Sequence, residues 1–282
     1  MRAAVLGVLL GAAGSAAAGE RKPLDAADGF VSSLVIHEAH GALRFAFTPE
    51  AGVLANAEYR EGGGGHWATE PKQPVIGMAA NEADVAWVAF DLAHYQDCLE
   101  LDGCKAKKVS LVHRAMTLLQ GGRPIAAHIA SPWTAKAQKE SLNGGWKLTE
   151  VDKKIDKGAE DVVKRFESTI GDPKLLAASV SARPEAVLFG SEAAERWVGG
   201  DKVKAQLVKW KLGFKVNGGV QAGVTKAGAM GWVAANVDAF PIAKPAQVTP
   251  YRVTAFYEKA AAGWQLVALH FSFAENPYAG GP

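Results

Sequence analysis

The stretch GWQLVALHFS at residues 263–272 decides the fold, because it is a long run of aliphatic and aromatic residues that contains no proline. Three further runs of β-forming residues precede it, at residues 219–225, 229–238 and 249–258. The connections between these runs are short, as they are between antiparallel strands. We therefore predict an antiparallel sheet in the second half of the chain.

Two helices are expected ahead of these strands. The first has a capping residue in Asp156, followed by apolar residues at helical spacing until a glycine and Pro173 end it. A short strand is expected at residues 187–189. The second helix begins near Asp201 and ends at Gly213. Helices followed by a series of strands predict an α+β fold with the helices packed on one face of the sheet.

The body of the chain repeats once. Four short segments of the first half recur in the same order in the second half, at offsets that drift between 135 and 145 residues. Matches that keep their order predict that both halves adopt the same fold. The matched segments are Pro49–Leu54 with Pro184–Phe189, Ala86–Ala89 with Gly231–Ala234, His113–Leu118 with Tyr251–Phe256, and Pro124–Ser131 with Gln265–Ser272.

The repeat divides the chain into two domains and a linker. Residues 134–157 are rich in charge, contain NGG at residues 143–145 and lack sustained periodicity, which predicts a linker. The first domain is expected at residues 23–133 and the second at residues 158–276. The first domain is about ten residues shorter where the second helix should be, and the glycine-rich stretch EGGGGH at residues 61–66 stands in its place.

Residues 1–18 have the order of charge, apolar core and small residues that is typical of a secretory signal peptide. Cleavage is expected between Ala18 and Gly19, so the mature protein is expected in the periplasm or outside the cell. No later apolar run is long enough to cross a membrane, so no membrane span is expected in the mature chain. The balance of 31 basic and 29 acidic residues offers no basic face for nucleic acid.

Cys98 and Cys104 are the only cysteines of the chain and flank the turn-forming pair Asp102-Gly103. In an oxidising compartment, this spacing predicts one local disulfide, with two free thiols as the alternative. A second cysteine pair that would complete a zinc site is absent. The stretch HEAH at residues 37–40 is not the H-E-x-x-H motif, and the glycine-rich stretch is no P-loop, so neither a metal nor another cofactor is expected.

The second half resembles the SnoaL-like branch of the nuclear transport factor 2-like (NTF2-like) superfamily. The resemblance rests on ERWVG at residues 195–199, GWV at 231–233, YRVT at 251–254, and the stretch 263–272. The last two strands are also similar to the association domain of calcium/calmodulin-dependent kinases. Through the internal repeat, the resemblance extends more weakly to the first half, which is a degenerate copy.

The resemblance implies two cone-shaped domains, each a curved antiparallel sheet with helices on one face and a pocket inside the cone. It also implies that the two sheets pair as a pseudo-dimer within the chain. It does not imply one activity, because the superfamily includes isomerases, cyclases, dehydratases and non-catalytic ligand-binding or assembly modules.

Within each strand, alternation puts Asp238 on the same face as Trp232, and His270 on the same face as Ser272. If the concave face holds both Asp238 and His270, they line one pocket and are candidates for proton transfer. Each candidate also has a structural alternative: His270 as a hydrogen-bonded core residue, Arg252 as the partner of an acidic residue, and the tryptophans as core. The expected ligand pocket comprises Trp197, Trp210, Trp232, Asp238, Arg252 and His270.

Two functions remain open at this stage. The first is an exported tandem SnoaL-like protein that binds a small, mostly apolar ligand or acts as an assembly module. The alternative is an enzyme of the isomerase, dehydratase or hydrolase type that uses general acid–base chemistry in the second-domain pocket.

Overall fold

The chain is described here by a computed structural model. The predicted signal peptide, Cys98, Cys104 and nearly all of the predicted linker lie outside the described residues, so what the sequence predicts of them stays a prediction. None of the helices within the described ranges is long and apolar enough to cross a membrane. The described residues are 22–31, 46–48, 53–56, 66–97, 108–130 and 153–273, with side chains at 22–31, 71–93, 114–130 and 153–273.

The first half forms a six-stranded sheet with the order β1-β2-β6-β5-β4-β3. Strands β3 to β6 are antiparallel to their neighbours, and the short β2 adds parallel to β6. A helix at residues 22–31 covers one face of this sheet, where Ala27 and Val31 pack against Phe90 and Leu92. The strands are β1 (Ala46–Thr48), β2 (Val53–Asn56), β3 (His66–Met78), β4 (Val85–Asp97), β5 (Lys108–Gln120) and β6 (Arg123–Ala130).

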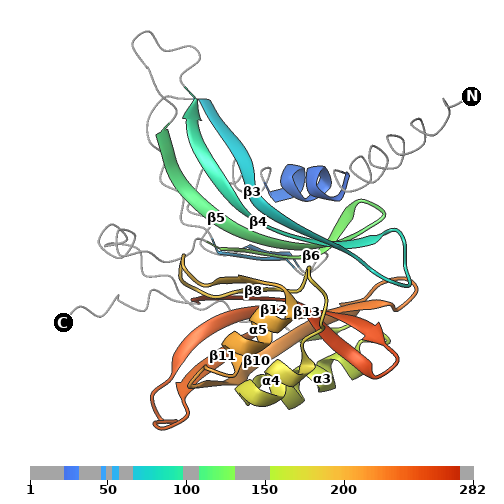
Figure 1. Cartoon of the computed structure of the whole chain (residues 1–282), viewed down its shortest axis with the longest axis vertical. Helices are drawn as coiled ribbons and strands as arrows, with labels where there is room; N and C mark the ends of the chain where they lie inside the picture. Colours follow the sequence, from blue (N-terminus) through green and yellow to red (C-terminus); the bar gives the residue numbers. More distant parts are fainter. Residues whose placement is uncertain are drawn as a thin grey trace, which may run out of the picture.

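The second half forms a seven-stranded sheet with the order β7-β10-β11-β12-β13-β8-β9 and three helices on one side (Figure 1). This arrangement confirms the predicted α+β class and the antiparallel strands. Its helices are α3 (Glu160–Ile170), α4 (Pro173–Ser179) and α5 (Gly200–Leu207). Its strands are β7 (Lys154–Ile155), β8 (Val187–Phe189), β9 (Arg196–Val198), β10 (Leu212–Val224), β11 (Met230–Pro241), β12 (Thr249–Ala260) and β13 (Gly263–Phe273).

The helices differ from the prediction in three places. Helix α4 was not predicted, because Pro173 looks like a helix terminator; it occupies the first helical position instead, where a missing N–H is tolerated. The Asp172 carboxylate caps this helix by accepting the Lys174 N–H at 2.7 Å. Helix α3 begins at Glu160 rather than beside the predicted cap. Helix α5 ends at Leu207 and not at Gly213, which belongs to β10.

Apart from the extra edge strand β7 of the second sheet, the two sheets have corresponding strand orders, and their central strands share a register. Arg114 of β5 lies between Asp91 and Ala130 of its neighbours, and Arg252 of β12 lies correspondingly between Asn236 and Ser272. A register shift follows Leu118 in the first sheet and Phe256 in the second. These equivalences agree with the internal repeat in the sequence.

Each sheet also packs one tryptophan over a glycine of the neighbouring strand. Trp87 lies over Gly77, and Trp232 lies over Gly223. A Cβ atom added to these glycines would come within 2.0 Å and 2.7 Å of the respective indole rings. The glycines are therefore required by close packing rather than by a special backbone conformation.

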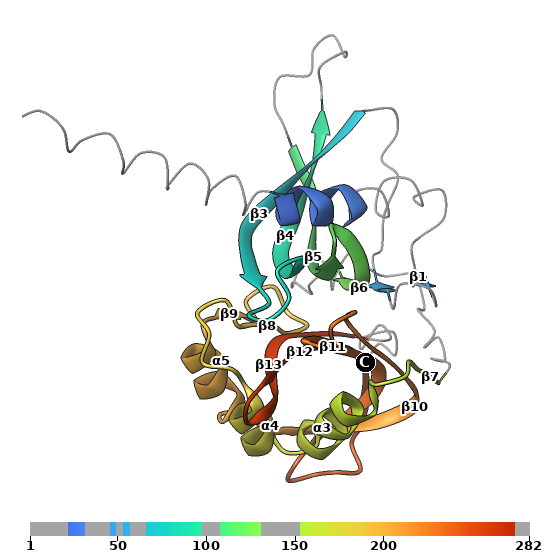
Figure 2. The same ribbon diagram turned by 90° about the vertical axis from the view of Figure 1, so that its right-hand side faces the viewer.

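The two sheets pack face to face, so the layers run helix, sheet, sheet, helices (Figure 2). One apolar cluster joins them, with Trp87 and Met116 from the first sheet and Trp232 and Phe256 from the second. The turn at residues 79–84 extends this contact with polar bonds.

Within that turn, the Glu82 carboxylate accepts the Ala227 N–H at 2.9 Å and also accepts the Thr225 hydroxyl. The neighbouring Ala80 N–H donates to Glu258 at 2.8 Å, and Glu258 pairs with Arg183 at 3.0 Å. The two halves are thus joined by both apolar packing and polar bonds, of which the one between Thr225 and Glu82 is buried.

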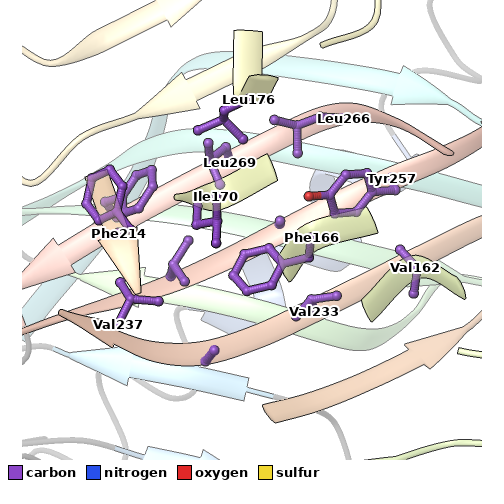
Figure 3. Packing of buried hydrophobic residues seen from close by; sticks show 14 of the residues in the cluster. Val162, Phe166, Ile170, Leu176, Phe214, Val233, Val237, Tyr257, Leu266 and Leu269 are labelled. Atoms are coloured by element: carbon purple, nitrogen blue, oxygen red, sulfur yellow. The ribbon is translucent and has the colours of Figure 1, made fainter. Parts of the chain in front are cut away.

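The other face of the second sheet packs against its own helices (Figure 3). Val233 and Val237 of β11 meet Phe166 and Ile170 of α3, and Leu266 and Leu269 of β13 belong to the same apolar cluster. Side chains fill most of the space between the sheet and its helices.

Candidate functional site

The structure separates the six predicted pocket residues into different environments. Trp232, Arg252 and His270 lie on the face of the second sheet that packs on the first sheet, and all three are buried. Trp197 and Trp210 lie on the other side of the sheet, where they are half-buried against the core that includes the helices. The predicted residues do not line one common cavity.

Asp238 and His270 are not brought together. Asp238 faces Pro250 on β12, whereas His270 faces Thr254 of the same strand, four positions further along. Four residues of a strand span about 13 Å, too far for both groups to act on one atom. The Asp238 carboxylate instead accepts a hydrogen bond from Asn217 at 3.0 Å near the surface.

His270 packs against a second histidine between the two sheets. Its ring stacks on that of His128 from β6, with ring centroids 3.9 Å apart and an interplanar angle of 27°. The Nε2 atom of His128 lies 2.9 Å from the Ser272 hydroxyl oxygen. The edge of Phe189 closes the cluster, 5.4 Å from the His270 ring centroid.

Burial makes both histidines weak bases. Loss of hydration and, to a smaller extent, the nearby charge of Arg252 together lower the pKa of His128 to about 3. Burial, then the neighbouring His128 and Arg114, lower the pKa of His270 well below its usual value. Both rings are therefore neutral at neutral pH, and their environment is that of a structural core rather than a catalytic base.

A cavity of about 260 Å³ opens at the rim of the second-half core. Four aromatic side chains form its wall: Trp210 after α5, Phe214 of β10, Tyr251 of β12 and Phe271 of β13. The rings of Phe214 and Phe271 stack with centroids 4.6 Å apart, and the Trp210 ring stands edge-on to Phe271 at 5.5 Å. We call this cavity the aromatic pocket.

One wall of the aromatic pocket is polar. It consists of Gly190, Ser191 and Glu195 from the connection between β8 and β9. The Glu195 carboxylate accepts the Glu192 N–H at 3.0 Å, yet burial is the larger effect and raises the pKa of this carboxyl. The remaining lining residues are Gln206, Lys209, Lys211 and Leu212.

Sequence reasoning found only Trp210 of this pocket. Tyr251 and Phe271 stand next to the predicted Arg252 and His270 but point to the opposite face of the sheet, as alternation along a strand requires. The face that strand alternation assigned to the pocket around Arg252 and His270 lies against the other sheet. Glu195 begins the ERWVG stretch on which the resemblance rests, but nothing in that stretch predicts its place beside a pocket.

A smaller hollow of about 180 Å³ lies where the two halves meet, between Gln120 of the first sheet and Trp232 of the second. Its charged lining residues, Lys154 and Asp156, are exposed at the surface. Within the described ranges, no group of three or more His, Cys, Asp or Glu side chains is arranged to hold a metal ion.

Comparison with known proteins finds similarity only among solved structures. No protein-family model and no curated protein matches the chain. An NTF2-like protein of unknown function from Pseudomonas putida is 18% identical, with a TM-score of 0.32 over 40% of this chain and 82% of that one. An NTF2-like superfamily protein from Salmonella enterica is 17% identical, with a TM-score of 0.31 over 50% of this chain and 93% of that one.

A ketosteroid isomerase-like protein from Erwinia carotovora is 20% identical, with a TM-score of 0.30 over 40% of this chain and 88% of that one. Two of these three solved structures are described as NTF2-like and the third as ketosteroid isomerase-like. Each of these similarities covers half of the chain or less.

Proposed function

We propose that the protein is a binding protein for a small, mostly apolar ligand, which it holds in the aromatic pocket. The observation that carries this proposal is the convergence of four aromatic rings on one cavity at the rim of the second-half core. Binding sites are typically concave and apolar, with a few polar groups that orient the ligand. Glu195 and Ser191 supply those groups here.

The size and lining of the pocket limit the ligand. A cavity of about 260 Å³ suits a molecule of one or two rings rather than a large substrate. A flat ring stacks favourably on Trp210 or Phe271. A hydroxyl or N–H group on the ligand can donate to the Glu195 carboxylate. The ligand class is therefore a small aromatic or cyclic compound with one donor group.

A second candidate function is general acid–base catalysis in the same pocket, of the isomerase, dehydratase or hydrolase type. The specific observation in its favour is Glu195, because a carboxyl group with a raised pKa beside an apolar cavity suits proton transfer near neutral pH. Of the residues that the sequence nominated for this chemistry, neither Asp238 nor His270 lines this pocket.

We further propose that the protein is a tandem of two NTF2-like domains that pair as an intrachain pseudo-dimer and is exported. The shared register and the face-to-face packing of the sheets support the tandem. Export rests on the sequence of residues 1–18. Intact-mass measurement of the exported protein is expected to give a start at Gly19; a mature pool that keeps Met1 would contradict export.

Binding can be tested with 2-naphthol as the probe and 5-fluorotryptophan as the reporter. In ¹⁹F NMR, 2-naphthol should shift the resonance of Trp210, assigned through Trp210→Phe, and leave those of Trp87 and Trp232 in place. Trp210→Ala should weaken 2-naphthol binding about tenfold, or about 1.4 kcal/mol.

The matched control is Trp197→Ala, because this side chain is half-buried against the same core but does not line the pocket. It should change 2-naphthol affinity less than twofold. Absence of any shift at Trp210, up to the solubility limit of the probe, would refute the proposed pocket.

A further inference from the structure

The polar wall of the aromatic pocket is held by a side chain from the other half of the protein. Arg114 of β5 is only 2% exposed and points across the contact between the sheets into the loop at residues 190–195. Its Nη1 atom donates to the carbonyl oxygens of Gly190, Glu192 and Glu195 at 3.3, 3.1 and 3.1 Å. Its Nη2 atom donates to the Ala193 carbonyl at 3.0 Å.

The loop is folded so that these carbonyl groups converge on the guanidinium. The Gly190 N–H donates to the Glu195 carbonyl at 2.8 Å, and the Glu195 N–H donates to the Glu192 carbonyl at 2.9 Å. Gly190 is required here, because a Cβ atom would lie 2.2 Å from the Glu195 carboxylate. Carbonyl oxygens that point together need a donor with several N–H groups, and a guanidinium has five in a rigid plane.

The guanidinium is itself fixed on its remaining sides. Its Nε atom pairs with the Asp91 carboxylate at 3.1 Å, which neutralises the buried charge. Its plane lies over the Phe189 ring, 4.8 Å from the ring centroid, directly before the loop begins. Asp91 thus holds Arg114 to the first sheet, while Phe189 packs against it from the second.

The loop that Arg114 holds is also the polar wall of the pocket. One side of the loop lines the cavity, through Gly190, Ser191 and Glu195. The carbonyl groups on its other side face Arg114. The Glu195 carboxylate keeps its place through hydrogen bonds within this same loop, from the Glu192 N–H and the Ser191 hydroxyl. Displacement of the loop would therefore displace the polar group that orients the ligand.

We propose that Arg114 of the first half is a positioning residue for the ligand pocket of the second half. This role rests on the proposed function of that pocket. It follows that the first half is more than a scaffold: contact between the sheets and ligand binding are linked, and each strengthens the other.

The test compares Arg114→Met with Arg183→Met in the full chain. Both arginines contact the opposite half, since Arg183 lies over the Trp87 ring at 4.7 Å, but Arg183 donates to Glu185 and Glu258 and not to the loop. Hydrogen–deuterium exchange of the amides at residues 190–196 reports the loop directly. It should become at least tenfold faster in Arg114→Met and remain within twofold in Arg183→Met.

A variant that keeps the positive charge is included in case Arg114→Met fails to fold. Arg114→Lys keeps the pairing with Asp91 but has too few donors for four carbonyl groups, so loop exchange should rise by an intermediate three- to tenfold. In both Arg114 variants, 2-naphthol should bind at least fivefold more weakly than in Arg183→Met.

Unchanged exchange at residues 190–196 in the Arg114 variants would overturn the proposal. So would an increase spread evenly over strands β10 to β13, because it would mean a general loss of stability. If 2-naphthol fails to bind the unaltered protein, the proposed function fails, whereas local exchange at the loop still decides whether Arg114 positions this wall.

Discussion

Acidification should weaken the protein through the stacked pair His128 and His270. Both rings are buried and neutral, and burial lowers the pKa of His128 to about 3 and that of His270 well below its usual value. In the unfolded chain, each imidazole regains a pKa near 6.5. Below that pH, the unfolded state binds more protons than the folded state, so stability falls as the pH falls. Above it, the contribution of the pair is fully present.

The expected loss of stability can be calculated, because a pKa difference of one unit between the folded and unfolded states corresponds to about 1.36 kcal/mol in the free energy of unfolding. From pH 7 to pH 4.5, about two units below the unfolded value, each histidine should remove about 2.7 kcal/mol from the free energy of unfolding. The two together should remove about 5 kcal/mol, a large share of the 5–15 kcal/mol typical of a whole protein. The loss from His128 should level off near pH 3, where the folded protein also binds the proton.

The assay is urea unfolding followed by tryptophan fluorescence at pH 7.5, 6, 5 and 4.5, for the unaltered protein and for His128→Gln/His270→Gln. Glutamine does not titrate, and at position 128 it can still reach the Ser272 hydroxyl in place of Nε2. The carboxylates are common to both proteins, so their effect cancels in the difference. Below pH 5.5, stability of the unaltered protein should fall more steeply, by about 2.7 kcal/mol per pH unit. Parallel curves would refute the assignment of both rings as neutral in the folded state.

Two further predictions concern packing and the cysteines. Gly77→Ala should destabilise the protein by about 1–3 kcal/mol in urea unfolding, because its methyl group would overlap the Trp87 ring. The control is Gly29→Ala. Gly29 lies in a helix, and a Cβ atom added there has no neighbour within 4 Å, so this substitution should stabilise the protein by about 0.5–1 kcal/mol. Stability changes of the same sign in both variants would contradict this argument. Thiol alkylation followed by mass spectrometry should find Cys98 and Cys104 unmodified until the protein is reduced. Reduction should lower the free energy of unfolding by no more than about 2–3 kcal/mol. Alkylation of both thiols without reduction would rule the disulfide out.

Strands β10 to β13 were predictable because each is long and rich in β-forming residues, and their position after the helices predicted the α+β class. The orientation of the second sheet was not. Trp232 and Val233 alternate along β11, and both are buried, one against the first sheet and the other against the helices. When both faces of a sheet are covered, side-chain polarity does not distinguish the face that packs on the helices from the face that packs on the other sheet. The polar face around His270 consequently looked like a pocket.

Helix α4 and the contact between Arg114 and the wall of the aromatic pocket are harder to predict from sequence for other reasons. Helix α4 was hidden by Pro173, whose place at the first helical position depends on the cap at Asp172. Arg114 donates hydrogen bonds to backbone carbonyl groups of the loop at residues 190–195, and every residue carries such a group. The identity of the loop residues therefore does not predict this contact. Only the pairing of the two sheets brings its parts together.

Asp91 and Asn236 occupy equivalent places beside the two buried arginines, Arg114 and Arg252. In an assembly of identical subunits, one codon specifies both places, so a mutation always alters the two sides at once. Here each side has a codon of its own. Natural selection can keep an acid beside Arg114 and an amide beside Arg252, and one side can specialise while its counterpart stays unchanged.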